Sequence, residues 1–361
     1  MSAIIRKGSA VKPAALLSLI LSPCELYAAE VFNKEDKRIE FIGEINGHHQ
    51  FSSDPDEKGD ETYARFSLLG ELPLSDSLSG YGLFEYNVQG NTVEENNDSS
   101  VWLAYAGVKG ESGLSLDYGR NEGLIYDTAA WTDVLPVFGN DTYTEEDNFM
   151  AGRASNVLTL RVTDALGKLE GLDFAIQYQG QNAGSRELMQ QNGEGLGYSV
   201  SYETEYGLSV AAAFIRSGRT DEQKRLTQNQ SEKAEAWATS LKYDDSTLYL
   251  AVSWGETHNL TALDDGAVAQ KTKNLEIVGQ YQFESGFRPS IAWLQSVAYT
   301  SEHSRFDRVK YLDLALFYDL NEHFTLYVDH KINRLNGGSD AVRAHELSSA
   351  NVTATGMVYH F

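Results

Sequence analysis

The sequence predicts an all-β protein, a 16-stranded antiparallel transmembrane β-barrel that follows an export signal. Three observations lead to this fold class. Segments of alternating apolar and polar residues recur along nearly the whole chain, and the joins between them alternate between short and long. The composition suits strands and tight turns, with Tyr 20, Phe 15 and Gly 31 but only Pro 6. No stretch reaches the ~18–20 consecutive apolar residues of a membrane-spanning helix.

Residues 1–28 predict a signal peptide that is removed from the mature chain. Three basic residues precede a short apolar run at residues 14–21 (AALLSLIL), and small residues permit cleavage after Ala28. The single cysteine, Cys24, lies within this segment. We interpret it as a small residue of the discarded signal, with a lipid-modification site as the alternative. Residues 29–361 are then expected to form one barrel domain.

The predicted strands run about 8–14 residues each, which is the length that a tilted strand needs to cross a bilayer. Their expected spans are 38–51, 61–72, 80–91, 100–110, 113–120, 151–162, 171–180, 194–205, 207–218, 232–244, 246–257, 272–284, 286–299, 307–319, 323–333 and 350–361.

The lengths of the connections between strands predict that the two ends of the barrel differ. Short turns are expected at 76–79, 111–112, 205–206, 244–245, 284–285 and 321–322. Long polar loops are expected at 52–60, 92–99, 121–150, 181–193, 218–231, 258–271, 300–306 and 334–349. Short turns at one end and long loops at the other are typical of an up-and-down outer-membrane barrel.

Alternation also predicts which side chains share a face. Val101, Leu103 and Tyr105 are expected on one face and Trp102 on the other. Near the C-terminal end, leucines at even positions should lie opposite Asp313. Aromatic residues near strand ends are expected on the apolar face, as in an interfacial girdle: Tyr243, Tyr249, Trp254, Phe317 and Tyr318.

A soluble β-sandwich is the structural alternative, because its strands alternate too. The pattern here continues through many strands without a domain break, which favours the barrel. Lipid offers the backbone no hydrogen-bond partner, so a sheet in a bilayer must close on itself. At about sixteen strands the interior is too wide for side chains to fill, and it should hold water.

The charge of the chain excludes some partners and favours others. The formal net charge is −23, and removal of residues 1–28, which carry a net +2, leaves −25. Nucleic acid is not an expected partner, because phosphate binding needs clustered Lys and Arg. Cations and cationic solutes are expected ones.

Short segments spread over the mature chain carry a family resemblance. They are 29–34 (AEVFNK), 62–65 (TYAR), 80–82 (GYG), 85–87 (EYN), 89–91 (QGN), 103–107 (LAYAG), 117–121 (DYGRN), 126–127 (YD), 132–133 (TD), 135–136 (LP), 138–139 (FG), 152–153 (GR), 177–178 (QY), 237–239 (WAT), 242–244 (KYD), 280–283 (QYQF), 288–290 (RPS) and 358–361 (VYHF). In this order the chain resembles the general diffusion porins of Gram-negative outer membranes. The resemblance implies a homotrimer of 16-stranded barrels with a third loop folded inward.

The resemblance assigns a pore constriction to the loop at about 121–150, whose tip is 132–141 (TDVLPVFGND). Asp133 and Asp141 would line the pore there, although a solvated acidic surface loop is the alternative from the residues alone. Arg65 and Arg153 match two arginines of the opposite wall. For Arg65 the alternation agrees, because an arginine facing lipid at mid-depth costs about 2–4 kcal/mol.

Three positions depart from the pattern of that family. Trp102 replaces an expected arginine, Val137 replaces an expected glutamate of the loop tip, and Glu44 replaces an expected lysine. The waist of the pore thus loses two positive groups and one negative group and gains a bulky indole. We hypothesise a narrower or more apolar waist that prefers cations.

The resemblance also implies contacts between subunits and a signal for assembly. Glu94 or Glu95, in the second long loop, would pair with Arg120 of a neighbouring subunit as a trimer latch. Tyr359 and Phe361 end the chain on its apolar phase and resemble the signal that the outer-membrane insertion machinery reads.

The sequence gives no support for an enzyme or a cofactor. It contains no HExxH, GxSxG, Walker or Rossmann motif. The expected function is passive diffusion of small hydrophilic solutes and cations through the outer membrane, in contact with its lipids and lipopolysaccharide. A substrate-specific channel is the alternative, since Trp102 could belong to an aromatic ladder. A barrel that acts as an adhesin through its acidic loops is a further one.

Overall fold

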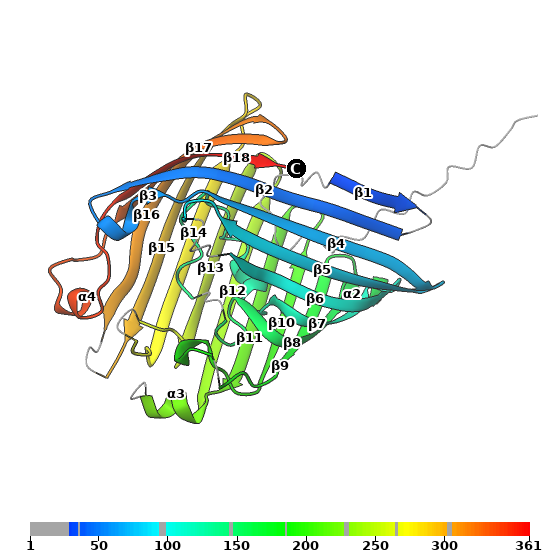
Figure 1. The fold of residues 1–361 in the computed structure, drawn as a ribbon, viewed down its shortest axis with the longest axis horizontal. Coiled ribbons are helices and arrows are strands. Elements are labelled where there is room, and N and C mark those ends of the chain that lie inside the picture. The colour runs from blue at the N-terminus through cyan, green and yellow to red at the C-terminus, as the bar shows by residue number, and fades with distance from the viewer. Residues whose placement is uncertain are drawn as a thin grey trace, which may run out of the picture.

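The computed structural model describes residues 29–34, 37–93, 99–143, 147–184, 186–226, 231–263, 266–301 and 305–361. The predicted signal peptide therefore lies outside the described residues. The described residues form one sheet of antiparallel strands that curls into a barrel (Figure 1).

Sixteen long strands make up the closed ring, as predicted, each one antiparallel to its neighbours in sequence. The strands are β2 (Lys37–Ser52), β4 (Tyr63–Ser75), β5 (Leu78–Gln89), β6 (Ser100–Gly110), β7 (Leu114–Glu122), β8 (Arg153–Val162), β9 (Leu172–Gln179), β10 (Gly195–Glu203), β11 (Leu208–Gly218), β12 (Lys233–Asp244), β13 (Leu248–His258), β14 (Lys271–Tyr281), β15 (Phe287–Tyr299), β16 (Phe306–Asn321), β17 (Phe324–Asn333) and β18 (Val352–His360). Pairing of β18 with β2 closes the ring. The short β1 (Ala29–Lys34) and β3 (Gly59–Asp60) both add to β2.

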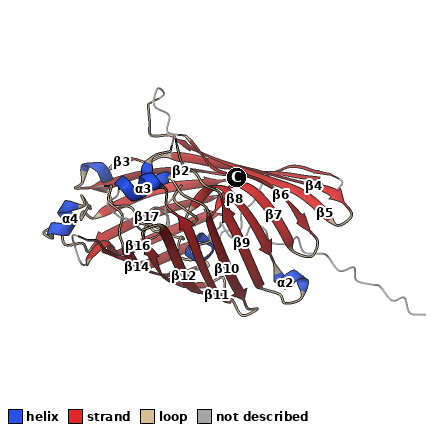
Figure 2. Ribbon diagram, turned by 90° about the horizontal axis from the view of Figure 1, so that it is seen from below, coloured by secondary structure: helices blue, strands red, loops and turns tan. Residues whose placement is uncertain are grey.

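Most long and short connections lie at opposite ends of the barrel, as predicted; an exception is the connection 163–171, which contains α2 (Asp164–Gly167) and lies at the end of the short turns. Figures 1 and 2 show α3 (Asp221–Leu226) and α4 (Asp340–Ala344) at one end, with β3, and α2 at the other. The 3-10 turns Pro55–Glu57 and Leu188–Gln190 belong to the long loops. The helix α1 (Tyr126–Ala129) belongs to the connection between β7 and β8. None of the described helices is long and apolar enough to cross a membrane.

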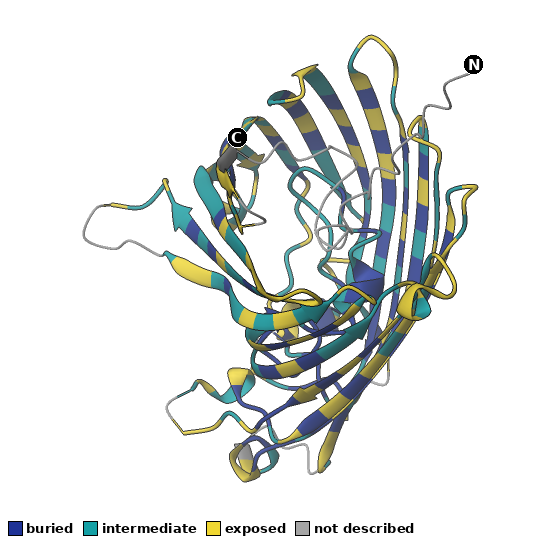
Figure 3. Ribbon diagram, turned by 90° about the vertical axis from the view of Figure 1, so that its right-hand side faces the viewer, coloured by how far each residue is buried: buried dark blue, intermediate teal, exposed yellow. Residues whose placement is uncertain are grey.

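Each strand turns one set of side chains outward and the other inward. In β11 exposed and buried residues alternate strictly, with Val210 and Phe214 exposed and Ala211 and Ala213 buried. The same alternation is visible as bands along the strands in Figure 3. In β16 the leucines at even positions are outward and Asp313 is fully buried on the inner side, as expected.

The expectation that Val101 and Leu103 share one face was wrong. A β-bulge in β6 shifts the pairing with β5 between Glu85↔Leu103 and Tyr86↔Val101, so that Trp102 is the extra residue. Val101 is therefore exposed on the outer surface (37%), whereas Leu103 is fully buried inside (0%). Strict alternation cannot anticipate such an insertion.

Two aromatic residues assigned to the outer girdle face inward. The Tyr249 hydroxyl donates a hydrogen bond to the Trp131 carbonyl of the connection between β7 and β8. Phe317 is buried on the inner wall, where it packs with Tyr327. Trp254, by contrast, is exposed on the outer surface as expected.

The first and the last of the described strands both pair with β2. Phe361 continues the pairing of β18, and its backbone exchanges two hydrogen bonds with Gly43 at 2.9 and 3.0 Å. Just beyond, Ala29 of β1 pairs with Phe41. The Phe361 ring packs over Gly43 and lies 5.4 Å from the Phe41 ring centroid. The absence of a side chain at Gly43 makes room for this ring.

We predict that Gly43→Leu weakens closure of the barrel. A Cβ atom at residue 43 would lie 2.6 Å from Phe361 Cζ and 2.9 Å from the Arg65 carbonyl oxygen, so the backbone must move. Overpacking of this kind costs about 1–3 kcal/mol. The readout is the fraction of heat-resistant folded protein on unheated detergent gels.

The matched control is Gly47→Ala, because a Cβ atom there would lie 4.0 Å from Met357 Cγ, an ordinary contact. Equal folded fractions for the two variants would contradict the role of Gly43.

Candidate functional site

The connection between β7 and β8 spans residues 123–152, and its described part, 123–143 and 147–152, lies inside the barrel against the inner wall. We call it the inner loop. Its two roots are joined, because the Gly123 amide donates to the Gly152 carbonyl at 2.9 Å. A Cβ atom at residue 123 would lie 2.3 Å from the Met150 carbonyl carbon, so only glycine permits this approach. The loop predicted at 121–150 is thus found at nearly those bounds.

Small side chains on the wall make room for the inner loop. Leu124, Ile125 and Phe149 of the loop pack into one buried cluster, and the wall supplies mainly alanines to it. These wall alanines are Ala154, Ala175, Ala213, Ala234, Ala236 and Ala238. Because alanine projects so little, the loop backbone can lie flat against the strands and bury its own apolar side chains.

The first root of the inner loop is held by an ion pair. Asp127 of α1 accepts hydrogen bonds from both terminal nitrogens of Arg161 on β8, at 2.9 and 3.0 Å. Ser199 of β10 donates to the same carboxylate. A bidentate pair of this kind fixes orientation as well as distance.

The middle of the loop is clamped by one carboxylate. Glu276 of β14 accepts from the Thr132 hydroxyl at 2.6 Å with one oxygen and from the Thr142 hydroxyl at 2.7 Å with the other. Arg308 of β16 donates to the backbone carbonyls of Asp141 and Thr142 at 2.8 and 2.6 Å. Glu276 thus binds both ends of the segment 132–142, which we call the arch.

The tip of the arch lies against β14 to β17. The backbone amides of Val137 and Phe138 donate to Asp329 at 3.1 and 3.3 Å, and Gln280 donates to the Val134 carbonyl at 2.9 Å. The Val137 side chain packs against a buried cluster of the wall. At this predicted constriction position the apolar side chain thus contacts the barrel wall.

A cluster of charged and aromatic side chains lies on the inner side of β2, β4, β6 and β8. Arg65 forms an ion pair with Glu44 of β2, and the Tyr63 hydroxyl donates to the same carboxylate at 2.9 Å. The Arg65 guanidinium lies 4.4 Å from the Trp102 ring centroid, and the Arg153 guanidinium lies 3.9 Å from it. Three predicted constriction residues, Arg65, Trp102 and Arg153, are therefore in contact with one another.

The two predicted acidic residues of the loop have different surroundings. Asp133 accepts a hydrogen bond from the Tyr126 hydroxyl at 2.7 Å. Burial and the nearby Asp133 carboxylate raise the pKa of the Tyr126 phenol well above its ordinary value, and Arg153 opposes the rise. The phenol thus stays protonated and able to donate. Burial also raises the pKa of the Asp141 carboxyl, against the effects of Lys331 and Arg308.

Arg120 has partners within its own chain. It forms an ion pair with Asp147 of the inner loop, and its Nε donates to the carbonyls of Val101 and Trp102 at 3.1 and 2.9 Å. Glu94 and Glu95, the predicted latch partners, lie outside the described residues. Tyr359 is exposed on the outer surface, 5.9 Å from Phe361 between ring centroids.

Sequence reasoning did not single out the residues that hold the inner loop. Glu276 and Asp329 are charged residues on the inward phase of their strands, and Asp127 and Arg161 are far apart in the sequence. An inward acid of a wide barrel is usually solvated, so alternation alone cannot separate an anchor from a solvated side chain. The inward alanines of β11 and β12 were the available signal.

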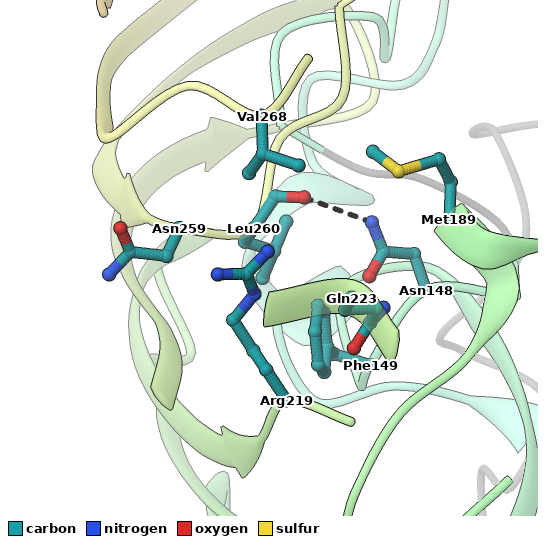
Figure 4. Close-up of a pocket in the computed structure, with 8 residues that line it drawn as sticks. All are labelled: Asn148, Phe149, Met189, Arg219, Gln223, Asn259, Leu260 and Val268. Atoms are coloured by element: carbon teal, nitrogen blue, oxygen red, sulfur yellow. Dashed lines mark hydrogen bonds between the residues drawn. The ribbon is translucent and has the colours of Figure 1, made fainter. Parts of the chain in front are cut away.

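A small pocket lies where the second root of the inner loop meets long loops at the end of the barrel that carries α3 (Figure 4). Asn148 donates to the Leu260 carbonyl there at 3.1 Å. The pocket is also lined by Phe149, Met189, Arg219, Gln223, Asn259 and Val268. This contact ties the loop root to the long loops at that end of the barrel. In the part of the chain that the structure describes, no group of three or more His, Cys, Asp or Glu residues could hold a metal ion.

Comparisons with known proteins agree with this architecture. Residues 34–361 match the protein family described as Gram-negative porin. The chain is 41% identical to outer membrane porin N of Escherichia coli (strain K12) and 40% identical to outer membrane protein S2 of Salmonella typhi; each match covers 96% of this chain and 98% of the relative. The fold is similar to that of Salmonella typhi OmpF in complex with daunomycin, with a TM-score of 0.85 and 34% identity over 92% of this chain and 100% of that one.

We predict that Glu276→Ala loosens the inner loop. The Thr142 hydroxyl would lose its acceptor, whereas the Thr132 hydroxyl could still donate to the Ala129 carbonyl. A buried polar group left without a partner costs about 1–3 kcal/mol. Open-channel current noise in a planar bilayer should rise, because the segment loses the carboxylate that joins its two ends and keeps there the contacts with Arg308 and Ala129.

Glu256→Ala is the matched control for this experiment. Glu256 lies on the outward phase of β13, where it pairs with His258 at 3.5 Å and Lys273 at 3.7 Å. Indistinguishable noise in the two variants would show that Glu276 does not hold the loop.

Proposed function

Because the chain belongs to the Gram-negative porin family, we propose that it is a passive diffusion channel for small hydrophilic solutes and ions and that it prefers cations. It is a β-barrel protein of the Gram-negative outer membrane. The ring of sixteen strands supports the proposal, since a barrel of that size is too wide for its own side chains to fill. The inner loop would narrow this passage without sealing it.

The ion pair between Glu44 and Arg65 is the observation that carries the proposed cation preference. An arginine on the wall of a pore attracts anions, but a neighbouring carboxylate offsets its charge and weakens this attraction. Here the carboxylate lies against the guanidinium, and Trp102 stands where the resemblance implies another arginine. With Asp133 on the inner loop and a formal charge of −23 on the chain, the balance of charge favours cations.

We further propose that the protein acts as a homotrimer in contact with membrane lipids and lipopolysaccharide. Its outer surface carries a broad set of exposed apolar side chains, as a lipid-facing or subunit-facing surface requires. Arg120 with Glu94 or Glu95 stays the proposed latch between subunits, alongside the contact of Arg120 with Asp147 in its own chain. Tyr359 and Phe361 are the proposed signal for the assembly machinery.

A substrate-specific sugar channel is the second candidate, and the contact of Trp102 with two arginines favours it. Swelling of liposomes with a graded series of neutral sugars separates the two. A smooth decline of rate with solute size supports general diffusion, whereas one sugar that enters faster than smaller ones supports a specific channel.

The preference for cations is tested by the reversal potential of the wild-type channel in a KCl gradient. We expect a potential of the sign given by K⁺ permeability above Cl⁻ permeability. A potential of the opposite sign would rule out the proposed preference while leaving the channel itself intact.

Glu44→Gln should reduce the cation preference, because it removes the carboxylate that lies against the Arg65 guanidinium and leaves the more distant Glu85 to offset that charge. One unit charge about 4 Å from an ion in water contributes about 1 kcal/mol, so the permeability ratio should fall roughly two- to fivefold. Glu322→Gln is the matched control, since this side chain is half-exposed in the turn between β16 and β17. An unchanged ratio in the Glu44 variant would contradict the role of its ion pair with Arg65.

A further inference from the structure

Trp102 reaches the inner side of the barrel through a local change in the strand. The extra residue of the β6 bulge stands between outward-facing Val101 and inward-facing Leu103. Bulges commonly re-aim a single side chain, at the cost of local pairing. The backbone of β6 is thus adapted to deliver one large indole toward Arg65 and Arg153.

The indole and the two guanidinium groups form a layered contact. Arg65 comes from β4 and Arg153 from β8, on either side of β6, and their guanidinium carbons lie 4.4 and 3.9 Å from the ring centroid. Cation–π contacts of this kind are attractive and hold a guanidinium over the face of the ring. Arg65 is additionally fixed by Glu44 and by contact with Tyr63. A long, flexible arginine side chain can swing aside for a passing solute, whereas this group is held at several points.

Arg120 holds the bulge that carries the indole. Its Nε donates to the carbonyls of Val101 and Trp102, the two residues at the insertion. Its terminal nitrogens engage Asp147 of the inner loop and Ser155 of β8. One side chain therefore connects the backbone of the bulge to the second root of the inner loop.

We propose that Trp102 sets the size limit of the passage and that Arg120 is a positioning residue for it. The proposal rests on the diffusion function proposed above and adds the residue that determines which solutes pass. Removal of the indole takes away the common surface of both guanidinium groups, so the passage should widen and its wall should become mobile. Loss of Arg120 should release the bulge and have the same effect at a distance.

The test compares sugar entry into liposomes for the wild type, Trp102→Ala, Trp102→Phe and Arg120→Met, each first shown to be folded by its heat-resistant band on gels. We expect Trp102→Ala to raise the rate for a trisaccharide relative to a monosaccharide several-fold, with a smaller rise for Trp102→Phe. Trp254→Ala, on the outer surface of β13, is the matched control and should leave the ratio unchanged.

Arg120→Met should raise the same ratio, and Asp147→Asn should raise it less, because Arg120 Nε can still donate to the bulge. A merely structural role of Arg120 would lower the thermal stability of the folded band and leave the ratio of sugar rates at its wild-type value. A folded Trp102→Ala channel with the wild-type ratio would overturn the proposal. Failure of the wild type to admit any sugar would instead overturn the diffusion function.

Discussion

The structure depends on one constraint: every backbone amide and carbonyl within the lipid must find its partner inside the protein. A sheet meets this demand only when it has no edge, and here β18 pairs with β2 to remove the last one. Closure at sixteen strands fixes the width of the interior, and the width creates the space that the inner loop enters. The outward apolar side chains and the inward polar ones follow from the same geometry.

The inner loop shows how a wide barrel can hold a long segment without a conventional core. Apolar loop residues rest on inward alanines, while the polar backbone of the loop is met by side chains of the wall. Glu276 and Asp329 accept hydrogen bonds from the loop, and Arg308 donates to it. The loop is thus bound as a ligand would be, by shape and by convergent polar groups, although it belongs to the same chain.

Much of the fold could be predicted because its period is so simple. The sixteen strands, the alternation of short and long joins and the position of the long loop all follow from a repeat of two residues and from turn-forming sequences. The route of the inner loop could not be predicted, because the interacting pairs, such as Thr132 with Glu276, are remote in sequence and each member looks solvated by itself. A strict two-residue period cannot predict the bulge at Trp102 either. Because of this bulge, Val101 faces outward and Leu103 faces inward, although they were expected on the same face. Tyr249 and Phe317 were misplaced because an aromatic near a strand end suits a membrane interface and a loop-covered wall equally well.

Ala29 and Phe361 both lie along one edge of β2. β1 and β18 lie end to end on that edge, so two strands together pair with this flank of β2. The pairing of β18 with β2 joins segments that are separated by almost the whole described sequence, as in the pair His360 and Glu44. Closing so long a loop carries a large entropic cost, and contacts of this kind slow folding. The seam between β18 and β2 is therefore the contact of the ring whose formation depends most on the prior order of the other strands.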